Sequence, residues 1–303
     1  MRTFVLSSLL VMLMVLTACG KTAEFSVQER MVEADDVTLY VRIAGNPESG
    51  NVLIALHGGP GLSSSYMLSL EQLASQEFAV VTYDQRGAGR SSDPSQGYAL
   101  LSYVADLEAV RKAIGAKRIH LIGHSWGGLV SMRYATVHPE TVKSIILMGS
   151  GPPSWEAVLD GQASKAERIL QLQQRGIIPD RPSALVEILP VYFSDPSFEV
   201  PGELKNLNYN GTVEQLTWSA VTEYDISTEV GKLEHRVLML WGEDDPFGLQ
   251  MAQATKNALS AAEVEFVVLK QCGHFWQECA EEFFCRVKSF LKQPPAPGGD
   301  TTR

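Results

Sequence analysis

Short apolar runs alternate with longer amphipathic stretches through most of this chain. Six runs have the length and composition of buried strands: NVLIALH (51–57), FAVVTYD (78–84), RIHLIGH (118–124), SIILMGS (144–150), RVLMLWG (236–242) and VEFVVLK (264–270). Helical spacing separates the first four runs, near residues 64–76, 100–114 and 126–138. Buried strands joined by helices predict an α/β fold, in which a mostly parallel sheet carries helices on both faces.

The pattern differs at the start and in the middle of the chain. Residues 25–45 alternate with period two, which predicts a hairpin of edge strands. Residues 152–230 carry several prolines, no strong strand pattern and amphipathic stretches such as 157–174, which predict a helical cap inserted after the sixth strand. The predicted organisation is therefore a first core segment at 30–151, a cap at 152–230, a second core segment at 231–292 and a disordered tail at 293–303.

The first residues have the pattern of an export signal. Met1 and Arg2 precede an apolar run at 4–16, which is too short to span a membrane comfortably. Leu16 to Cys19 resemble a bacterial lipobox, in which Cys19 becomes the lipidated first residue after removal of 1–18. We therefore expect an exported lipoprotein anchored to a membrane, with 19–29 as a spacer, and located at the outer membrane if the organism is Gram-negative. An ordinary signal peptide with a coincidental cysteine is the alternative.

The composition narrows the function. The 303 residues are 45% hydrophobic and 20% charged, as in globular proteins, and a net charge of -10 without a local cluster of Lys and Arg argues against nucleic-acid binding. We expect neither a cofactor nor a metal.

In an exported protein Cys272 and Cys279 could form a disulfide that braces the segment between them. The alternative is that these two and Cys285 are small buried hydrophobic residues.

A glycine-rich turn follows the strand at 118–124. In GHSWGG (123–128) the strand pattern changes to helical spacing at Ser125, which predicts a strained turn that exposes a serine nucleophile. Such a nucleophile needs a base, an acid that orients the base, and donors for an oxyanion. Of the six histidines, His274 alone follows the last strand, where a base belongs in the chain order Ser, acid, His.

The acid and the oxyanion donors are predicted from two further turns. The loop GEDDPFG (242–248) offers Glu243, Asp244 and Asp245 as acids, and two of these would be ordinary solvated turn residues. HGGPG (57–61) directly follows a strand, and its glycines let backbone N–H groups approach a developing negative charge. We predict that the N–H groups of Gly59 and Trp126 form the oxyanion hole.

Three motifs carry a family resemblance. HGGPG, DQRGAGRS (84–91) and GHSWGG together resemble the α/β-hydrolase fold and, within it, the proline iminopeptidase branch, including the tricorn-interacting type of aminopeptidase. The resemblance covers about residues 30–292. It implies a triad of Ser125, Asp245 and His274, release of an N-terminal residue, and structural roles for Asp84 and Arg86.

Recognition of a free amine favours a carboxylate in the cap. NGTVEQ (210–215) resembles a family segment whose acidic residue binds that amine, and Glu214 has the matching place; a solvated residue on a cap helix is the other interpretation. Relatives of the tricorn-interacting type often carry a second glutamate after the catalytic Asp, where this chain has Pro246. We expect an aminopeptidase acting on short peptides. A carboxylesterase or lactonase with the same triad is the alternative, and a non-catalytic binding lipoprotein is a remote one.

Overall fold

The computed structural model describes residues 26–293, and the predicted signal, Cys19 and residues 294–303 lie outside the described residues. An eight-stranded sheet forms its centre, with the order β1-β2-β4-β3-β5-β6-β7-β8. Its strands are β1 (Val27–Glu33), β2 (Thr38–Ala44), β3 (Val52–Leu56), β4 (Ala79–Tyr83), β5 (Ile119–His124), β6 (Val142–Met148), β7 (Arg236–Gly242) and β8 (Glu263–Leu269). The pairs β1–β2 and β2–β4 are antiparallel and the other pairs are parallel, so the predicted edge hairpin and mostly parallel sheet are confirmed.

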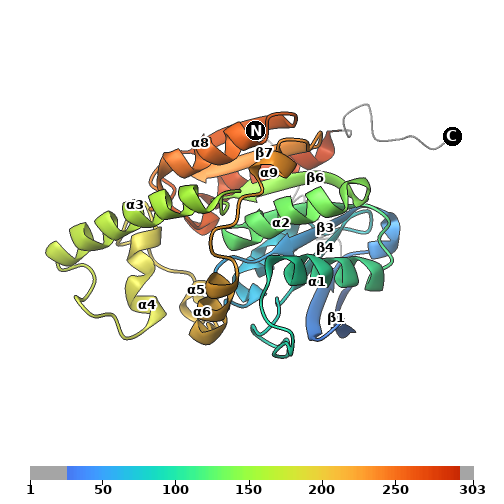
Figure 1. The fold of residues 1–303 in the computed structure, drawn as a ribbon, viewed down its shortest axis with the longest axis horizontal. Helices are drawn as coiled ribbons and strands as arrows, with labels where there is room; N and C mark the ends of the chain where they lie inside the picture. Colours follow the sequence, from blue (N-terminus) through green and yellow to red (C-terminus); the bar gives the residue numbers. More distant parts are fainter. Residues whose placement is uncertain (1–25, 294–303) are drawn as a thin grey trace, which may run out of the picture.

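Helices cover both faces of the sheet (Figure 1). The α-helices are α1 (Leu100–Ala113), α2 (Trp126–Val137), α3 (Trp155–Gln174), α4 (Leu185–Ile188), α5 (Gly202–Lys205), α6 (Gly211–Ala220), α7 (Ser227–Val230), α8 (Gly248–Ala258) and α9 (Ala280–Lys292). The 3₁₀ helices are η1 (Pro47–Ser49), η2 (Ser64–Leu73), η3 (Pro139–Thr141), η4 (Leu189–Tyr192) and η5 (Trp276–Cys279). None of the helices within residues 26–293 is long and apolar enough to cross a membrane.

The period-two geometry of the strands divides the core into two layers. Ile54 and Leu56 of β3 pack with residues of α1 and α2, whereas Leu53 and Ala55 pack on the other face with residues of η2 and α9. All four side chains are fully buried. Both faces of the parallel strands are therefore apolar, which explains why these runs are continuously hydrophobic in the sequence.

The first predicted helix has a different type in the structure. Residues 64–76 are predicted to be helical, and the structure has the 3₁₀ helix η2 at Ser64–Leu73. Its start is rich in serine, and these side chains make local and long-range hydrogen bonds: Ser63 with Ser65, and Ser64 with Asp84. Such side chains compete with the regular helical backbone pattern.

The structure shows what lies at two of the expected boundaries. β1 begins at Val27, inside the expected spacer 19–29, because Val27 still pairs with Ala44 of the hairpin. The expected cap 152–230 includes Ile226 and Val230, which belong to the main hydrophobic core. The helical insertion itself follows the sixth strand, as predicted, since α3 to α7 lie between β6 and β7.

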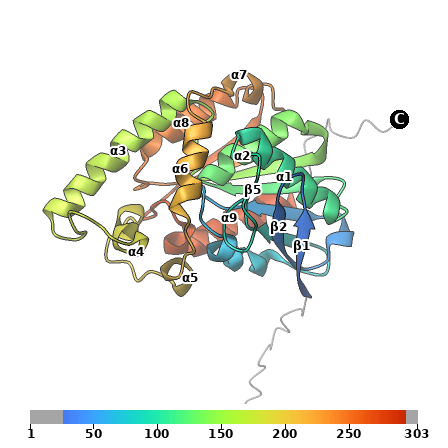
Figure 2. The ribbon, with the colours of Figure 1, turned by 60° about the horizontal axis from the view of Figure 1, so that its bottom comes forward.

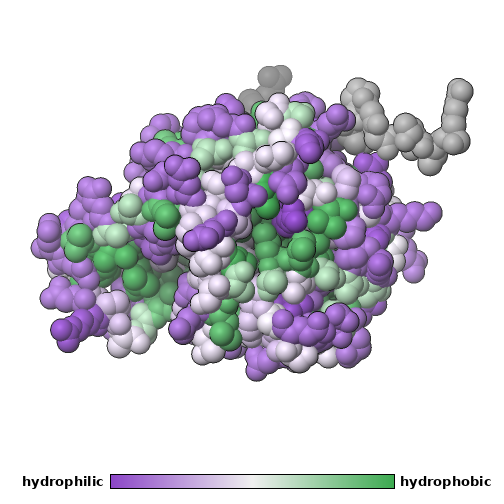
Figure 3. All heavy atoms as spheres, in the orientation of Figure 1, coloured by the Kyte–Doolittle hydropathy of each residue, from purple (hydrophilic) through white to green (hydrophobic). Residues whose placement is uncertain are grey.

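Part of the cap projects from the sheet domain. In both ribbon views α3 and α4 project beyond the body that contains the sheet (Figure 1, Figure 2). The small cluster within the cap has Leu172, Ile178 and Val191 as its buried members. Apolar side chains also gather at the surface over α3 and α4 (Figure 3), where Leu170 and Val186 are exposed.

Candidate active site

Ser125 lies at the sharp turn between β5 and α2. Its φ of 54° and ψ of -121° are rare for a residue with a side chain, so the surrounding structure must hold it in place. Its N–H donates to the carbonyl of Met148 at 3.0 Å, and its carbonyl accepts from the N–H of Gly151 at 2.7 Å. A Cβ at Gly123 would collide with the carbonyl group of Gly127, so glycine lets the strand and helix approach closely. The turn thus holds Ser125 in the wall of a cavity.

His274 and Asp245 form a buried hydrogen-bonded pair. His274 Nδ1 lies 2.8 Å from Asp245 Oδ2, and the two residues are 3% and 5% exposed. The His274 N–H donates to the carbonyl of Tyr192 at 2.7 Å, and the N–H of Phe247 donates to Asp245 Oδ1 at 3.0 Å. A carboxylate only accepts hydrogen bonds, so Nδ1 carries the proton in neutral His274. Nε2 is therefore left with the lone pair that a general base needs.

The other two acidic candidates in this loop lie away from His274. Asp244 is exposed and accepts a hydrogen bond from the Ser194 hydroxyl at 2.5 Å. Glu243 is also exposed and pairs with Lys270. The chain reverses direction between these residues and the next, because the Asp245 N–H bonds back to the carbonyl of Gly242 at 3.2 Å. Asp245 is therefore the acid of this loop that contacts the imidazole.

The HGGPG loop lies directly against Ser125. A Cβ at Gly58 would come within 2.8 Å of the Ser125 Cβ, and Gly59 has a left-handed φ of 50° that favours glycine. Gly59 and Trp126 both line the cavity beside Ser125. Within residues 26–293, no hydrogen bond involves the N–H of Gly59 or of Trp126. The two predicted oxyanion donors are therefore at the cavity with their N–H groups uncommitted.

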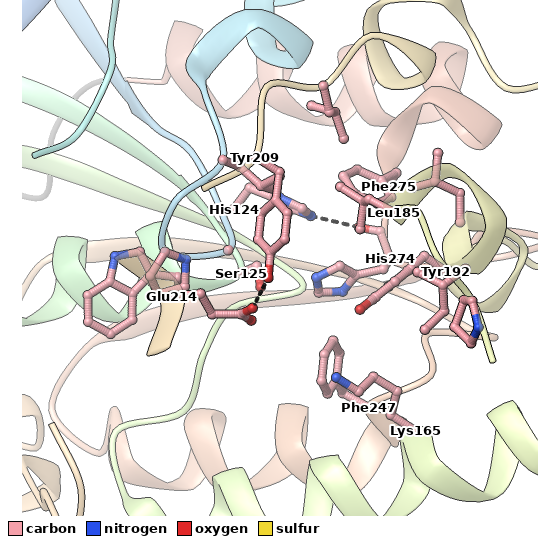
Figure 4. A pocket seen from close by; sticks show the side chains of 18 of the residues that line it. His124, Ser125, Lys165, Leu185, Tyr192, Tyr209, Glu214, Phe247, His274 and Phe275 are labelled. Carbon is pink, nitrogen blue, oxygen red and sulfur yellow. Dashed lines mark hydrogen bonds between the residues drawn. The ribbon is translucent and has the colours of Figure 1, made fainter. Parts of the chain in front are cut away.

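Ser125 and His274 face a common cavity of about 490 Å³ between the sheet domain and the cap (Figure 4). No hydrogen bond joins the Ser125 hydroxyl to His274 in this conformation. Such contacts are often loose in free active sites and tighten when substrate binds. The cavity has a volume in the range typical of small-molecule sites.

Two charged side chains from the cap line the same cavity. Glu214 of α6 is half-buried and accepts a hydrogen bond from the Tyr209 hydroxyl (Figure 4). Lys165 of α3 is also half-buried, with its Nζ 5.1 Å from the centre of the Phe247 ring. Among the described residues that line the cavity, Glu214 supplies the only carboxylate. The predicted amine-binding residue is thus brought to the same cavity as Ser125 and His274.

Comparisons with known proteins agree with this architecture. Residues 51–279 match the family model described as alpha/beta hydrolase fold. The chain belongs to the α/β-hydrolase fold family.

Proteins similar to this chain include proline iminopeptidases and an esterase. A proline iminopeptidase of Lactobacillus helveticus (strain DPC 4571) is 26% identical over 280 residues, which are 84% of this chain and 94% of that protein. The crystal structure of a proline iminopeptidase from Mycobacterium smegmatis has a TM-score of 0.70 at 21% identity and covers 87% of this chain and 97% of its own. An esterase from Exiguobacterium antarcticum has a TM-score of 0.67 at 20% identity, and the match covers 88% of this chain and 100% of the esterase chain. The sequence relatives support a hydrolase, and the structural likeness supports the fold.

The DQRGAGRS motif of this α/β-hydrolase builds the scaffold behind the site. The Asp84 carboxylate accepts from the N–H and hydroxyl of Ser64 at 2.7 and 2.8 Å, which ties the motif to the start of η2. Arg86 is buried and makes two bonds to the Asp106 carboxylate at 2.7 and 2.8 Å. The indole N–H of Trp126 donates a hydrogen bond to Gln85 Oε1 at 2.9 Å. These contacts fit the structural roles that the family resemblance implies for Asp84 and Arg86.

Sequence reasoning missed a buried hydrogen-bond chain beneath the site. The Gly58 N–H donates to the Tyr66 hydroxyl at 2.6 Å, and this hydroxyl lies 2.7 Å from His124 Nδ1. His124 Nε2 in turn lies 3.0 Å from the carbonyl of His274. Burial lowers the pKa of His124 far below its usual value, and the nearby His274 lowers it further, so His124 stays neutral and donates from one ring nitrogen only. These hydrogen bonds connect the HGGPG loop, the turn at Ser125 and the loop that carries His274.

A disulfide encloses the candidate base. Cys272 and Cys279 form a disulfide, which is the first of the two alternatives considered from the sequence. Cys285 is a free, exposed cysteine. The Gly273 N–H donates to Glu278 at 2.9 Å inside the same loop. The disulfide therefore joins the two ends of the loop that carries His274.

In the part of the chain described, no group of three or more His, Cys, Asp or Glu side chains could hold a metal ion.

Proposed function

We propose that this α/β-hydrolase is a serine aminopeptidase that releases N-terminal residues from short peptides through an acyl-enzyme. One observation carries the proposal: a strained serine, a buried His–Asp pair and a cap carboxylate line or adjoin one cavity. The named sequence relatives are proline iminopeptidases, which supports the same reaction class. Its chemistry would need no cofactor.

In the proposed mechanism, Ser125 Oγ attacks the carbonyl carbon of the substrate while His274 Nε2 accepts its proton. Asp245 orients the imidazole and stabilises the imidazolium that forms. The N–H groups of Gly59 and Trp126 stabilise the oxyanion. His274 then returns the proton to the departing amine, and water, deprotonated by the same imidazole, hydrolyses the acyl-enzyme.

Glu214 is the proposed binding group for the substrate ammonium. Its carboxylate lines the cavity and is half-buried, so attraction to a cation there is stronger than in bulk water. The Tyr209 hydroxyl occupies one of its oxygens and helps to orient it, and burial together with this carboxylate raises the pKa of Tyr209, so the hydroxyl remains a donor. The second oxygen is the one proposed to receive the amine.

A carboxylesterase or lactonase is the second candidate. The cavity is lined mainly by apolar side chains, Pro246 replaces the additional glutamate of some relatives, and an esterase has a similar fold. The test is a parallel assay of the purified chain on aminoacyl arylamides, proline included, and on short-chain aryl esters. Arylamide hydrolysis with a preference for a free amine supports the aminopeptidase. Ester hydrolysis with no arylamide hydrolysis would assign the chain to the second candidate.

We further propose that the protein is exported and anchored to a membrane through lipidated Cys19, which rests on the pattern of residues 1–19. Cys19→Ser should prevent incorporation of a labelled fatty acid and leave the signal uncut or cut at another position. Labelling that persists in this variant would contradict the proposed anchor.

A further inference from the structure

Lys165 brings an ammonium group to the His274 side of the cavity. It belongs to α3 and lines the cavity, with Nζ over the Phe247 ring at 5.1 Å. The Phe247 ring in turn lies 4.9 Å from the His274 ring, centre to centre. In Figure 4, Lys165 and Phe247 are drawn together on the His274 side of the cavity, whereas Glu214 is drawn on the Ser125 side. The cavity thus has a positive group near the candidate base and a negative group near the nucleophile.

Apart from the Phe247 ring, the ammonium has no fixed partner among residues 26–293. No hydrogen bond or ion pair involves Lys165, although it is half-buried. Arg168, one turn later on α3, is different: it donates to the carbonyls of Val191 and Phe193 and so holds the cap together. A cation taken out of water without a partner destabilises the protein, and burial accordingly lowers the pKa of Lys165, while attraction to Glu214 opposes this effect.

The reaction geometry relates these two charges to the two ends of a substrate. In the proposed mechanism His274 protonates the leaving amine, so the leaving residue must lie on the His274 side. In a dipeptide that leaving residue carries the free carboxylate. Among the described residues that line the cavity, Lys165 is the cation on this side. The N-terminal ammonium then lies toward Glu214.

We propose that Lys165 binds the C-terminal carboxylate of the substrate, and that the enzyme is selective for dipeptides with both termini free. This inference rests on the proposed aminopeptidase function. Lys165 is here a substrate-binding residue that sets specificity, because it would neutralise a charge that arylamides and peptide amides lack. The substrate carboxylate in turn supplies the hydrogen-bonding, anionic partner that Lys165 lacks in the free enzyme.

The test compares prolyl-alanine with prolyl-alanine amide, which differ in the C-terminal charge. The wild-type enzyme should prefer the free acid at least 10-fold in kcat/KM. Lys165→Met should lower kcat/KM for the acid roughly 30-fold, which is about 2 kcal/mol at 1.36 kcal/mol per decade, and should change the amide less than about 3-fold. Lys165→Arg should keep most of the preference, since the charge remains.

Lys256→Met is the matched control. Lys256 also lies over a phenylalanine ring, 5.5 Å from the centre of Phe266, but it is exposed and does not line the cavity. This variant should retain the wild-type ratio of acid to amide.

Each result decides between the two proposals. Equal wild-type rates on acid and amide, or equal losses on both in Lys165→Met, would overturn the carboxylate site while leaving the aminopeptidase intact. If neither peptide is hydrolysed and an aryl ester is, the aminopeptidase function fails and this inference fails with it. If Lys165→Met does not fold, the ratio of kcat/KM for the acid to that for the amide, measured in the wild type and in Lys165→Arg, still tests the carboxylate site.

Discussion

The sheet side and the cap side of the cavity are built differently. On the sheet side, His274 and Asp245 are almost fully buried, and hydrogen bonds fix the backbone of Ser125 and of His274. On the cap side, Glu214 and Lys165 are half-buried, and the buried cluster within the cap is small. Catalytic groups need precise placement, which the hydrogen bonds on the sheet side provide. We infer that the sheet side supplies chemistry common to many acyl substrates and the cap side selects among them.

The largest expected effect is the loss of the proposed nucleophile, Ser125, from the sheet side. Ser125→Ala should lower kcat at least about 10⁴-fold on every substrate, because no covalent intermediate can form. The thermal midpoint should stay close to that of the wild type, since only one hydroxyl is removed. Steady-state kinetics and thermal unfolding on the same preparation check both results, and retained turnover would contradict the proposed triad.

The proposed acid, Asp245 in the loop after β7, should have the next largest effect. Asp245→Asn removes the charge that orients the imidazole and stabilises the imidazolium, so kcat should fall roughly 10⁴-fold on peptides and esters alike. Asp244→Asn is the matched control, because Asp244 is exposed, bonds to Ser194 and should change kcat less than about 2-fold. A larger loss in Asp244→Asn than in Asp245→Asn would reverse the assignment of the acid.

The disulfide should have a smaller effect that is again independent of the substrate. Cys279→Ala frees one end of the loop that carries His274, and the loss of this short covalent loop should destabilise the fold by about 2 kcal/mol and lower the thermal midpoint by roughly 5 °C. We expect kcat to fall several-fold on peptides and esters together. Cys285→Ala removes the free exposed thiol and serves as the control. An unchanged midpoint and kcat in Cys279→Ala would show that the bridge does not support the loop.

Local sequence patterns predict much of the sheet side. Each predicted strand end, at Ser125, at the GEDDPFG loop and before His274, lies at the same edge of the sheet because parallel strands place their carboxyl ends together. The contact between Asp245 and His274 was expected and is present. The catalytic roles of these residues remain predictions.

The remaining parts of the site depend on contacts between distant segments. Tyr66 bonds to His124 across 58 residues, and His124 bonds to the His274 backbone across 150. No periodicity or local motif connects such positions. Lys165 likewise reads as one polar position on an amphipathic helix, and its place beside Phe247 arises only when α3 packs near the loop after β7. Val230, at the end of the expected cap, likewise packs in the main hydrophobic core with residues that are distant in the sequence.

The central claim, that the sheet side performs the chemistry and the cap side selects peptides, is tested most directly by Glu214→Gln. This change keeps the shape of the side chain and removes the charge proposed to bind the substrate ammonium. The account predicts that kcat/KM falls roughly 30-fold or more on prolyl arylamide and changes less than about 2-fold on an aryl ester that has no amine. Equal changes on the two substrates would contradict the division of roles and favour the esterase.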